Sequence, residues 1–420
     1  MNTMPLAAPT VEDVKKAAQT LNGVVFKTPL EFSETYSRKF GAEIYIKRED
    51  LQTVRSYKIR GSYNKMVSLS ADECQYGVVC ASAGNHAQGV ALSCRKLGIK
   101  GTIFMPSPTP NQKVQQVKMF GEDFVEVILT GDTFDDAKQE ALRFSQLHKS
   151  PFIHPFDDPK IIEGQATIGL EVLEEVEGKI DYLFVPVGGG GVASGMSTVF
   201  KKLSPETKII GVEPKGAPSM STSIFNGFNT ELEHIDKFVD GAAVKKVGDL
   251  TFEICKTNLH KTITVDEGEI CETILDLYNK NAIVAEPAGA LTIAALNQFE
   301  DAIEGKRVVC LISGGNNDIT RMEEIKERAM LYNGLKHYFL VKFPQRAGAL
   351  KEFVNDVLGP KDDITHFEYI KKNSREKGAA VVGIELKNRG DFDGLISRMK
   401  SRQFFGDYIN SNEVLMDILV

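Results

Sequence analysis

The amino-acid sequence predicts an α/β protein with two parallel-sheet subdomains, followed by a small α+β domain. Runs of strand-forming residues end in small residues and lead directly into helical patterns, an alternation typical of parallel sheets covered by helices on both faces. Three prolines within residues 150–159 interrupt this alternation, and a different pattern begins after Tyr332. Because 420 residues exceed what one core usually fills, we expect two or three domains.

The first half of the chain begins with a capped helix and then repeats a strand followed by a helix. Thr10 and Asp13 have the spacing of a capping box, and apolar residues share one face of the helix that follows them. A strand over 43–47 precedes a helix that begins near Lys58. We assign residues 55–150 to a smaller subdomain, with strands over 78–81, 102–105 and 124–129 that lead into helices over 85–97, 111–120 and 133–148.

The second half repeats the alternation and supplies most of a larger subdomain, within a catalytic domain over 1–331. Two α/β sheets in sequence place a ligand cleft beyond the carboxyl ends of their strands, so the residues at those ends are the candidate site. The expected strands cover 182–187, 208–212, 262–265 and 307–312, and the expected helices cover 161–176, 193–202, 266–281 and 287–298.

Composition excludes several classes of protein. The chain has 50 basic and 57 acidic residues and a net charge of −7, without a basic cluster that could follow a phosphate backbone, so we expect no nucleic-acid partner. The six cysteines are scattered and have no metal-ligand spacing. No apolar run approaches the roughly 20 residues of a membrane span, and the first residues lack the pattern of a signal peptide. We therefore expect a cytoplasmic protein with no membrane partner.

Residues 56–64, Ser-Tyr-Lys-Ile-Arg-Gly-Ser-Tyr-Asn, surround the candidate catalytic residue Lys58. A lysine beside an aromatic ring and aliphatic residues is a candidate for burial, which lowers the pKa of its ammonium group. The neutral amine can then attack a carbonyl or remove a proton, as in Schiff-base chemistry. Taken alone, the same pattern fits a solvated helix lysine, and only the other strand ends favour the catalytic interpretation.

The strongest strand end is a run of four glycines, Gly188, Gly189, Gly190 and Gly191, between a buried strand and a helix. Such a run can turn several backbone N–H groups toward one anion, and the positive helix end adds to the attraction, so we expect a phosphate there. Gly188, Gly190 and Ala193 also fit a loose dinucleotide pattern, with Glu213 as a candidate ribose acceptor. A nicotinamide-dependent oxidoreductase is therefore an alternative.

Two further strand ends carry groups that suit a small ligand. Ser82, Ala83 and Gly84 precede a helix and expose N–H groups that can bind a substrate carboxylate, while Asn85 can donate to a ring oxygen. Ser313 follows the strand over 307–312, where its hydroxyl can bond a heterocyclic nitrogen. Each stretch alone is equally compatible with an ordinary helix cap or turn.

Taken in order, residues 56–61, 82–89, 188–191 and 313–316 resemble the threonine dehydratases of the fold type II pyridoxal-phosphate enzymes, whose catalytic domain has the tryptophan synthase β-like fold. The resemblance covers essentially the whole chain. It implies that Lys58 binds pyridoxal 5'-phosphate as a Schiff base and that Ser82, Ala83, Gly84 and Asn85 bind the substrate. The remaining cofactor contacts that it implies are Asn85 at the ring hydroxyl, Gly188, Gly189, Gly190 and Gly191 at the phosphate, Ser313 at the ring nitrogen, and supporting contacts from Gly241 and Glu286.

Some members of this family bind a cation near a sequence like that around Glu213. The further carboxylate of such a site is replaced here by Ser219, and the loss of a hard oxygen ligand weakens the site. We expect Glu213 to face solvent at its strand end and the chain to hold no metal.

Residues 332–420 form the predicted C-terminal domain. Strands over 336–343, 364–369 and 379–384, with helices through Val357 and over 392–399, indicate a βαββαβ order of the ferredoxin-like kind. This domain resembles the ACT-like regulatory module of biosynthetic threonine dehydratases, present once. The resemblance implies isoleucine as effector, with valine as a second candidate, and a homotetramer or homodimer. A simple oligomerisation module is the alternative.

The resemblance implies dehydration and deamination of L-threonine to 2-oxobutanoate and ammonia, the first step of isoleucine synthesis, with L-serine as a second candidate substrate. A serine at the ring nitrogen makes the cofactor a weaker electron sink, which favours prompt β-elimination. The alternatives are serine dehydration, racemisation or β-replacement on the same cofactor, the nicotinamide enzyme, and a non-catalytic amino-acid sensor.

Overall fold

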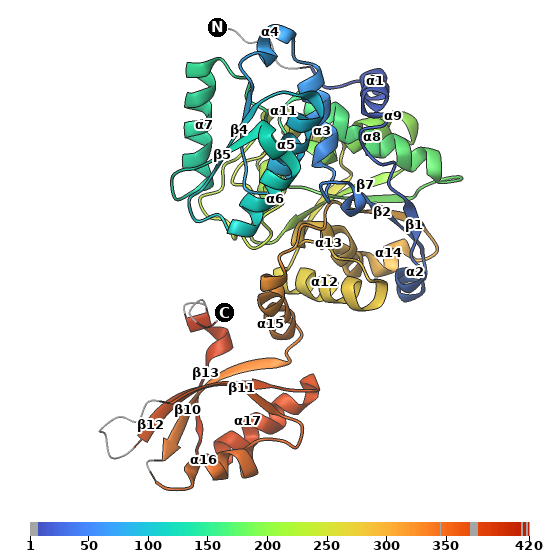
Figure 1. Ribbon diagram of the computed structural model, residues 1–420. Helices are drawn as coiled ribbons and strands as arrows, with labels where there is room; N and C mark the ends of the chain where they lie inside the picture. Colours follow the sequence, from blue (N-terminus) through green and yellow to red (C-terminus); the bar gives the residue numbers. More distant parts are fainter. Residues whose placement is uncertain (1–6, 345, 370–376, 413–414, 417–418, 420) are drawn as a thin grey trace. The chain divides into compact units, whose positions relative to one another are not determined.

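A computed structural model describes residues 7–344, 346–369, 377–412, 415–416 and 419 (Figure 1). The chain divides into two compact units, Met1–Asn317 and Asp318–Val420. Each unit has its own hydrophobic core, as expected of separate domains. The predicted domain boundary at Tyr332 stays a prediction. The absence of a signal peptide was predicted from the N-terminal residues, of which the first six lie outside the described part of the chain.

The larger sheet of the first unit has the order β1-β2-β9-β6-β7-β8. All neighbouring strands in it are parallel except β1 and β2. Strand β6 is buried along its whole length and β9 along all but its first residue, because helices cover both faces. The strands are β1 (Leu30–Phe32), β2 (Glu43–Arg48), β6 (Tyr182–Pro186), β7 (Lys208–Pro214), β8 (Lys261–Val265) and β9 (Arg307–Ile312).

Helices lie on both sides of this sheet, as Figure 1 shows. On one side, α8 packs against α9, and α1 and α11 pack against this pair. On the other side, α13 packs on β6 and β9, with α12 beside it. These helices are α1 (Val11–Leu21), α8 (Pro159–Glu175), α9 (Gly191–Leu203), α11 (Asp249–Asn258), α12 (Glu267–Asn281) and α13 (Pro287–Ala294).

The smaller sheet is parallel and has the order β3-β4-β5. The three predicted pairs of a strand and a helix are confirmed here. A core that includes Ile59, Val90, Ile103 and Val117 joins α3 and α5 to this sheet. The elements are α3 (Lys58–Val67), α4 (Ala71–Cys74), β3 (Val78–Ala81), α5 (Asn85–Leu97), β4 (Gly101–Met105), α6 (Asn111–Gly121), β5 (Val125–Leu129) and α7 (Phe134–His148).

The sequence analysis missed the short elements of this unit. Strand β1 has only three residues, and α2 (Glu34–Phe40), α10 (Ser219–Asn226), α11 and α14 (Glu300–Ile303) lie in stretches with weak periodicity. The single helix expected over 287–298 is divided into α13 and a 3₁₀ helix, Ala295–Phe299. Short elements gain most of their stability from tertiary packing, which local sequence patterns do not reveal. Among the described residues, no helix is both long and apolar enough to cross a lipid bilayer.

The second unit has a four-stranded antiparallel sheet of order β11-β12-β10-β13. Its core contains Phe339, Phe353, Val382 and Leu395. The predicted βαββαβ order is confirmed, and its last strand, for which no residue range was predicted, is β13. The elements are α15 (Met322–Tyr332), β10 (Lys336–Pro344), α16 (Ala349–Glu352), a π-helical turn Phe353–Val357, β11 (Asp363–Tyr369), β12 (Lys377–Glu385), α17 (Phe392–Ser401) and β13 (Phe405–Tyr408).

Candidate active site

Lys58 begins helix α3 and lies beside the carboxyl end of β9. The backbone N–H of Tyr57 donates to the carbonyl oxygen of Ser313 over 3.2 Å, and Ser56 forms an isolated bridge with Gly314. Two stretches that are more than 250 residues apart in the sequence are thus joined through the backbone. This joins the lysine stretch to the strand end that carries Ser313.

Among the described residues, the amine of Lys58 donates to one carbonyl. Its Nζ donates to the carbonyl oxygen of Pro155 over 3.0 Å and lies 5.3 Å from the centre of the Tyr57 ring. Burial lowers the pKa of this amine to about 8, while the negative charge of Glu286 acts in the opposite direction. A substantial neutral fraction therefore exists near neutral pH, as nucleophilic or basic chemistry requires.

The four glycines form a close-fitting turn between β6 and α9. A Cβ atom on Gly189 would lie 2.2 Å from the Phe156 ring, and one on Gly188 would lie 2.9 Å from Cα of Ala242. Gly190 has a φ of +92°, which favours glycine. Gly191 is the first residue of α9, a 13-residue helix whose N-terminal end attracts anions. Only glycine fits this turn, which suits a phosphate.

Asn85 takes part in a hydrogen-bond chain that joins both subdomains. Its Nδ2 donates to Oε1 of Glu286 over 2.7 Å. Its Oδ1 accepts from Nδ2 of Asn316 over 2.7 Å, and the same nitrogen of Asn316 donates to the carbonyl oxygen of Val54. One N–H of the Asn85 amide therefore remains for a ligand. Asn316 is a member of the site to which the sequence analysis gave no role.

Glu286 directly precedes α13 and is buried. Burial raises its pKa to about 7, the charge of Asp240 adds to the shift, and the bond from Asn85 opposes it. A Cβ on Gly314 would lie 2.5 Å from its Oε1, and one on Gly241 would lie 3.5 Å away. The two weaker sequence assignments, Gly241 and Glu286, are thus neighbours.

The loop between β3 and α5 contains the residues predicted to bind substrate. The N–H of Ser82 donates to the carbonyl oxygen of Phe104, and the hydroxyl of Ser82 accepts from the N–H of Gly84. Ser82 would thus contact a substrate through its side chain and not through its N–H. A Cβ on Gly84 would meet nothing within 4 Å, so the loop faces open space at this residue.

Glu213 does not face solvent, contrary to the sequence analysis, because α10 covers it. It is fully buried, and its carboxylate accepts from the N–H groups of Met220 and Ser221 and from the Ser221 hydroxyl. Burial raises its pKa to about 7, against these hydrogen bonds. Glu213 caps α10 and is not available to a ribose. The described part of the chain contains no group of three metal-ligating side chains.

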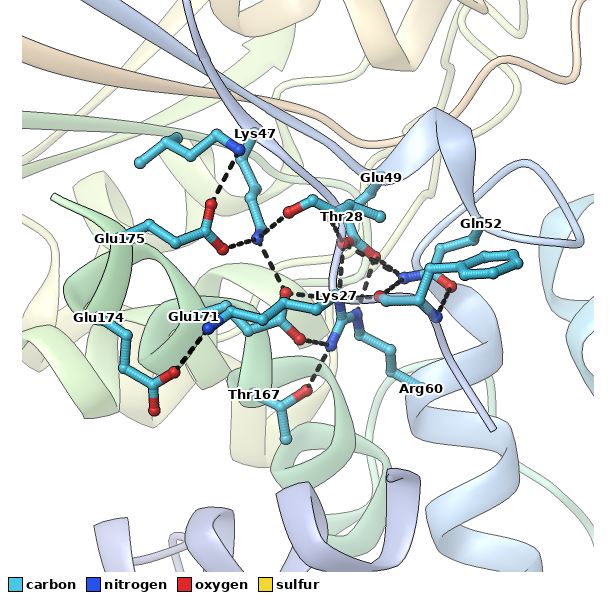
Figure 2. Close-up of polar contacts among 12 residues, drawn as sticks. Lys27, Thr28, Lys47, Glu49, Gln52, Arg60, Thr167, Glu171, Glu174 and Glu175 are labelled. Carbon is cyan, nitrogen blue, oxygen red and sulfur yellow. Dashed lines mark hydrogen bonds and ion pairs between the residues drawn. The ribbon is translucent and has the colours of Figure 1, made fainter. Parts of the chain in front are cut away.

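A buried ion cluster lies on the other side of α3 (Figure 2). Arg60 is fully buried and pairs with Glu49 at 2.7 Å and with Glu171 at 2.5 Å. Lys47 also pairs with Glu171, at 2.8 Å, and bonds Glu175. These contacts join β2 and α8 to the helix that begins at Lys58. The cluster therefore fixes the orientation of α3.

The residues around Lys58 fit pyridoxal phosphate. The amine has the lowered pKa that condensation with an aldehyde requires. The glycine turn leads into the N-terminal end of α9, which attracts anions such as a phosphate. The buried Ser56 hydroxyl has no hydrogen-bond partner among the described residues. A Cβ atom added to Gly314 would lie 3.1 Å from Cβ of Ser56, so the two residues are in close contact. A polar ligand at this place would satisfy the Ser56 hydroxyl.

Comparison with known proteins agrees with this fit. Residues 21–314 match the family described as pyridoxal-phosphate dependent enzyme, and residues 327–419 match the C-terminal regulatory domain of threonine dehydratase. The chain belongs to the pyridoxal-phosphate-dependent enzymes, and within them to the threonine dehydratases of the biosynthetic type.

The similar proteins cover nearly the whole chain. An L-threonine dehydratase biosynthetic IlvA of Halalkalibacterium halodurans is 56% identical over 410 residues, 98% of this chain and 99% of that protein. The corresponding protein of Bacillus subtilis is 53% identical over 98% and 97%. Among solved structures, threonine deaminase isoform 2 from Solanum lycopersicum has a TM-score of 0.73 and 38% identity over 79% of this chain and 94% of that chain.

Proposed function

We propose that the chain converts L-threonine to 2-oxobutanoate and ammonia by dehydration and deamination, as the first step of isoleucine synthesis. The observation that carries this proposal is the amine of Lys58, which is partly buried and has a pKa lowered to about 8, on the helix joined to the strand end of Ser313. The names of the relatives, biosynthetic L-threonine dehydratases at 56% and 53% identity, support threonine as the substrate.

In the proposed reaction, Lys58 moves the proton of the substrate α-carbon. Its neutral amine accepts this proton at Nζ, and the Pro155 carbonyl oxygen, 3.0 Å from Nζ, holds the resulting ammonium group. When bound, pyridoxal phosphate supplies an electron sink for the negative charge that develops at the α-carbon. The β-hydroxyl then leaves as water with the proton that Nζ had accepted, which gives an enamine. The enamine becomes an imine, and water hydrolyses the imine to the 2-oxoacid and ammonia.

The other predicted residues hold the cofactor and the substrate. The glycine turn of 188–191 would bind the phosphate through N–H groups and the N-terminal end of α9. Asn85 would donate its remaining amide N–H to the ring hydroxyl, and Ser313 would bond the ring nitrogen without placing a charge there. The substrate carboxylate would lie on the Ser82 hydroxyl and the backbone of Ala83 and Gly84, at the start of α5.

Supporting roles fall to Glu286 and Gly241. Glu286 holds Asn85 by a 2.7 Å bond, and its pKa of about 7 allows it to exchange a proton near neutral pH. Gly241 leaves room beside the carboxylate of Glu286.

Product analysis tests the proposed reaction. Purified protein should show an absorbance band of a lysine-bound cofactor that borohydride abolishes, and should form 2-oxobutanoate from L-threonine. Pyruvate from L-serine should form more slowly. Absence of the band together with tight binding of a nicotinamide dinucleotide would contradict the proposal.

We infer that the second unit binds isoleucine as a feedback effector, with valine as a competing ligand, in a homotetramer or homodimer. A cavity of about 590 Å³ in this unit supports the inference. Phe343 and Phe367 line it with apolar rings. Arg346, which pairs with Glu352, supplies a cation that suits a carboxylate. Gly348, at a φ of +83°, forms the turn before α16.

Titration of isoleucine against threonine turnover tests this inference. Isoleucine should raise the threonine concentration required for half-maximal rate, and Arg346→Ala should weaken this response. Arg402→Ala, at a half-exposed position that does not line the cavity, is the matched control. An unchanged response in Arg346→Ala would remove Arg346 from the effector site.

A further inference from the structure

The segment 153–158 connects the two subdomains and contacts the site at several points. The carbonyl oxygen of Ile153 bonds Nε2 of His86 over 2.8 Å, and that of Pro155 accepts from Nζ of Lys58. Asp158 caps α8 and forms an ion pair with Lys65 on α3. A segment that the sequence analysis treated as a crossing between subdomains is thus part of the site.

His154 determines the local shape of this segment. Its Nδ1 accepts from the N–H of Asp157 over 2.8 Å and from the N–H of Phe156 over 3.3 Å. A side-chain acceptor that bonds the N–H groups two and three residues ahead is the pattern by which Asn and Asp stabilise turns. The ring must be neutral with its proton on Nε2, because a protonated Nδ1 cannot accept.

The surroundings of His154 favour this neutral form. Burial lowers its pKa to about 4, and the charges of Lys138 and Lys58 add to the shift while Asp158 opposes it. Phe156 and Phe152 pack edge-on against the imidazole, with centres 4.8 and 6.1 Å away. The ring therefore remains an acceptor throughout the neutral pH range.

The turn that His154 holds orients three groups of the site. It directs the Pro155 carbonyl oxygen at Lys58 and the Phe156 ring at Gly189. The Asp157 carboxylate accepts from the first N–H groups of α11, at Asp249, Leu250 and Thr251. Thr251 in turn donates its hydroxyl to the carbonyl oxygen of Gly189 over 2.6 Å. One imidazole nitrogen thus acts on both the lysine and the glycine turn.

We propose that His154 is a positioning residue of the cofactor site, which as a hydrogen-bond acceptor fixes the turn that holds Lys58 and supports Gly189. This proposal rests on one part of the proposed function, which is that Lys58 and the glycine turn hold pyridoxal phosphate. His154 touches neither the cofactor nor the substrate in this role and acts through Pro155 and Phe156.

Three substitutions separate the acceptor from the bulk of the ring. In His154→Asn, Oδ1 takes the place of Nδ1 and can accept the same two N–H groups. His154→Leu removes the acceptor. His154→Gln keeps an amide of similar size but moves its oxygen one atom further along the side chain, away from the two N–H groups.

The measurement is the affinity of the apoprotein for pyridoxal phosphate, titrated by absorbance without substrate, together with kcat and KM of the holoenzyme. We expect affinity to fall about tenfold or more in His154→Leu and His154→Gln, the effect of losing a buried hydrogen bond. His154→Asn should stay within about threefold of the unsubstituted protein. The kcat value should follow the same order, with KM for threonine changed less.

Two results would overturn the proposal. Equal loss of affinity in His154→Asn and His154→Leu would show that the packing of the ring, and not the hydrogen-bond acceptor, determines the affinity. Undiminished affinity in His154→Gln would show that the turn does not depend on the acceptor. His154→Gln decides the matter if His154→Leu fails to fold. If the unsubstituted apoprotein does not bind pyridoxal phosphate at all, the proposed function fails, which is a distinct outcome.

Discussion

Two cations on helix α3, the partly buried Lys58 and the fully buried Arg60, have opposite surroundings. Arg60 has two carboxylate partners, Glu49 and Glu171, and although burial alone would lower its pKa, these ion pairs raise it. Lys58 has a carbonyl partner, and burial lowers its pKa to about 8. Residues two apart on a helix point about 200° apart around its axis, so the two cations lie on opposite faces.

The difference shows how one helix combines stability with reactivity. A buried cation that is fully paired stays charged and fixes the helix, whereas a buried cation without a close carboxylate loses its proton easily. Figure 2 shows the paired side, where Arg60, Glu49 and Glu171 lie together. We infer that the ion cluster allows the unpaired lysine to remain at the start of the same helix.

Replacement of Lys58 should have the largest effect. Lys58→Ala removes both the group that binds the cofactor and the base, so threonine turnover should fall by about 10³-fold or more. The melting temperature of the apoprotein should change little, because this side chain forms no ion pair with any residue that the structure describes. Lys96→Ala, on the exposed side of α5, is the control and should keep full activity. Residual turnover close to that of the control would exclude Lys58 as the catalytic residue.

Replacement of Arg60 should affect stability instead. Arg60→Met leaves the buried carboxylate of Glu49 unpaired, which should lower the free energy of unfolding by about 3–5 kcal/mol. The double substitution Arg60→Met with Glu49→Leu removes both charges and should recover much of this loss. Chemical denaturation measures both values. A stable Arg60→Met protein would show that the ion cluster does not hold α3.

Replacement of Gly189 should weaken cofactor binding. The new Cβ in Gly189→Ala would lie 2.2 Å from the Phe156 ring, so the turn or the ring must move. We expect the affinity for pyridoxal phosphate to fall by about tenfold, as for a displaced anion contact. Gly390→Ala, where a Cβ meets nothing within 4 Å, is the matched control. Titration of both apoproteins provides the comparison.

Replacement of Glu286 should have the smallest effect. The negative charge of Glu286 raises the pKa of Lys58, so Glu286→Gln should move the pH at which activity is half-maximal to a lower value. Glu286 is mostly ionised at pH 8, because its own pKa is about 7. Gln keeps the oxygen that accepts from Asn85, so the rate on the plateau should change only a few-fold. A shift to higher pH would contradict this electrostatic account.

The sequence predicts those parts of the candidate site that are local. The lysine stretch, the glycine run and Ser313 could be proposed because strand ends and glycine runs are recognisable within a few residues. The fold class followed from the same alternation, as the two parallel sheets and the βαββαβ tail confirm.

Contacts between residues that are distant in the chain could not be predicted from the sequence. Pro155 meets Lys58 across 97 positions, and Asn316 meets Asn85 across 231. Glu213 was expected at the surface because nothing near it in the sequence indicates that α10 would cover it. The short strand β1 was missed and β13 was predicted without a residue range, because three or four residues carry little periodicity.

The pKa of the Lys58 amine tests the central claim most directly. The rate at which an amine-specific reagent labels Lys58 in the apoprotein, followed against pH by peptide mass analysis, should have a midpoint near 8. Lys58→Ala provides the background. A midpoint near 10.5, the ordinary value of lysine, would contradict the claim that burial without a close carboxylate makes this lysine reactive.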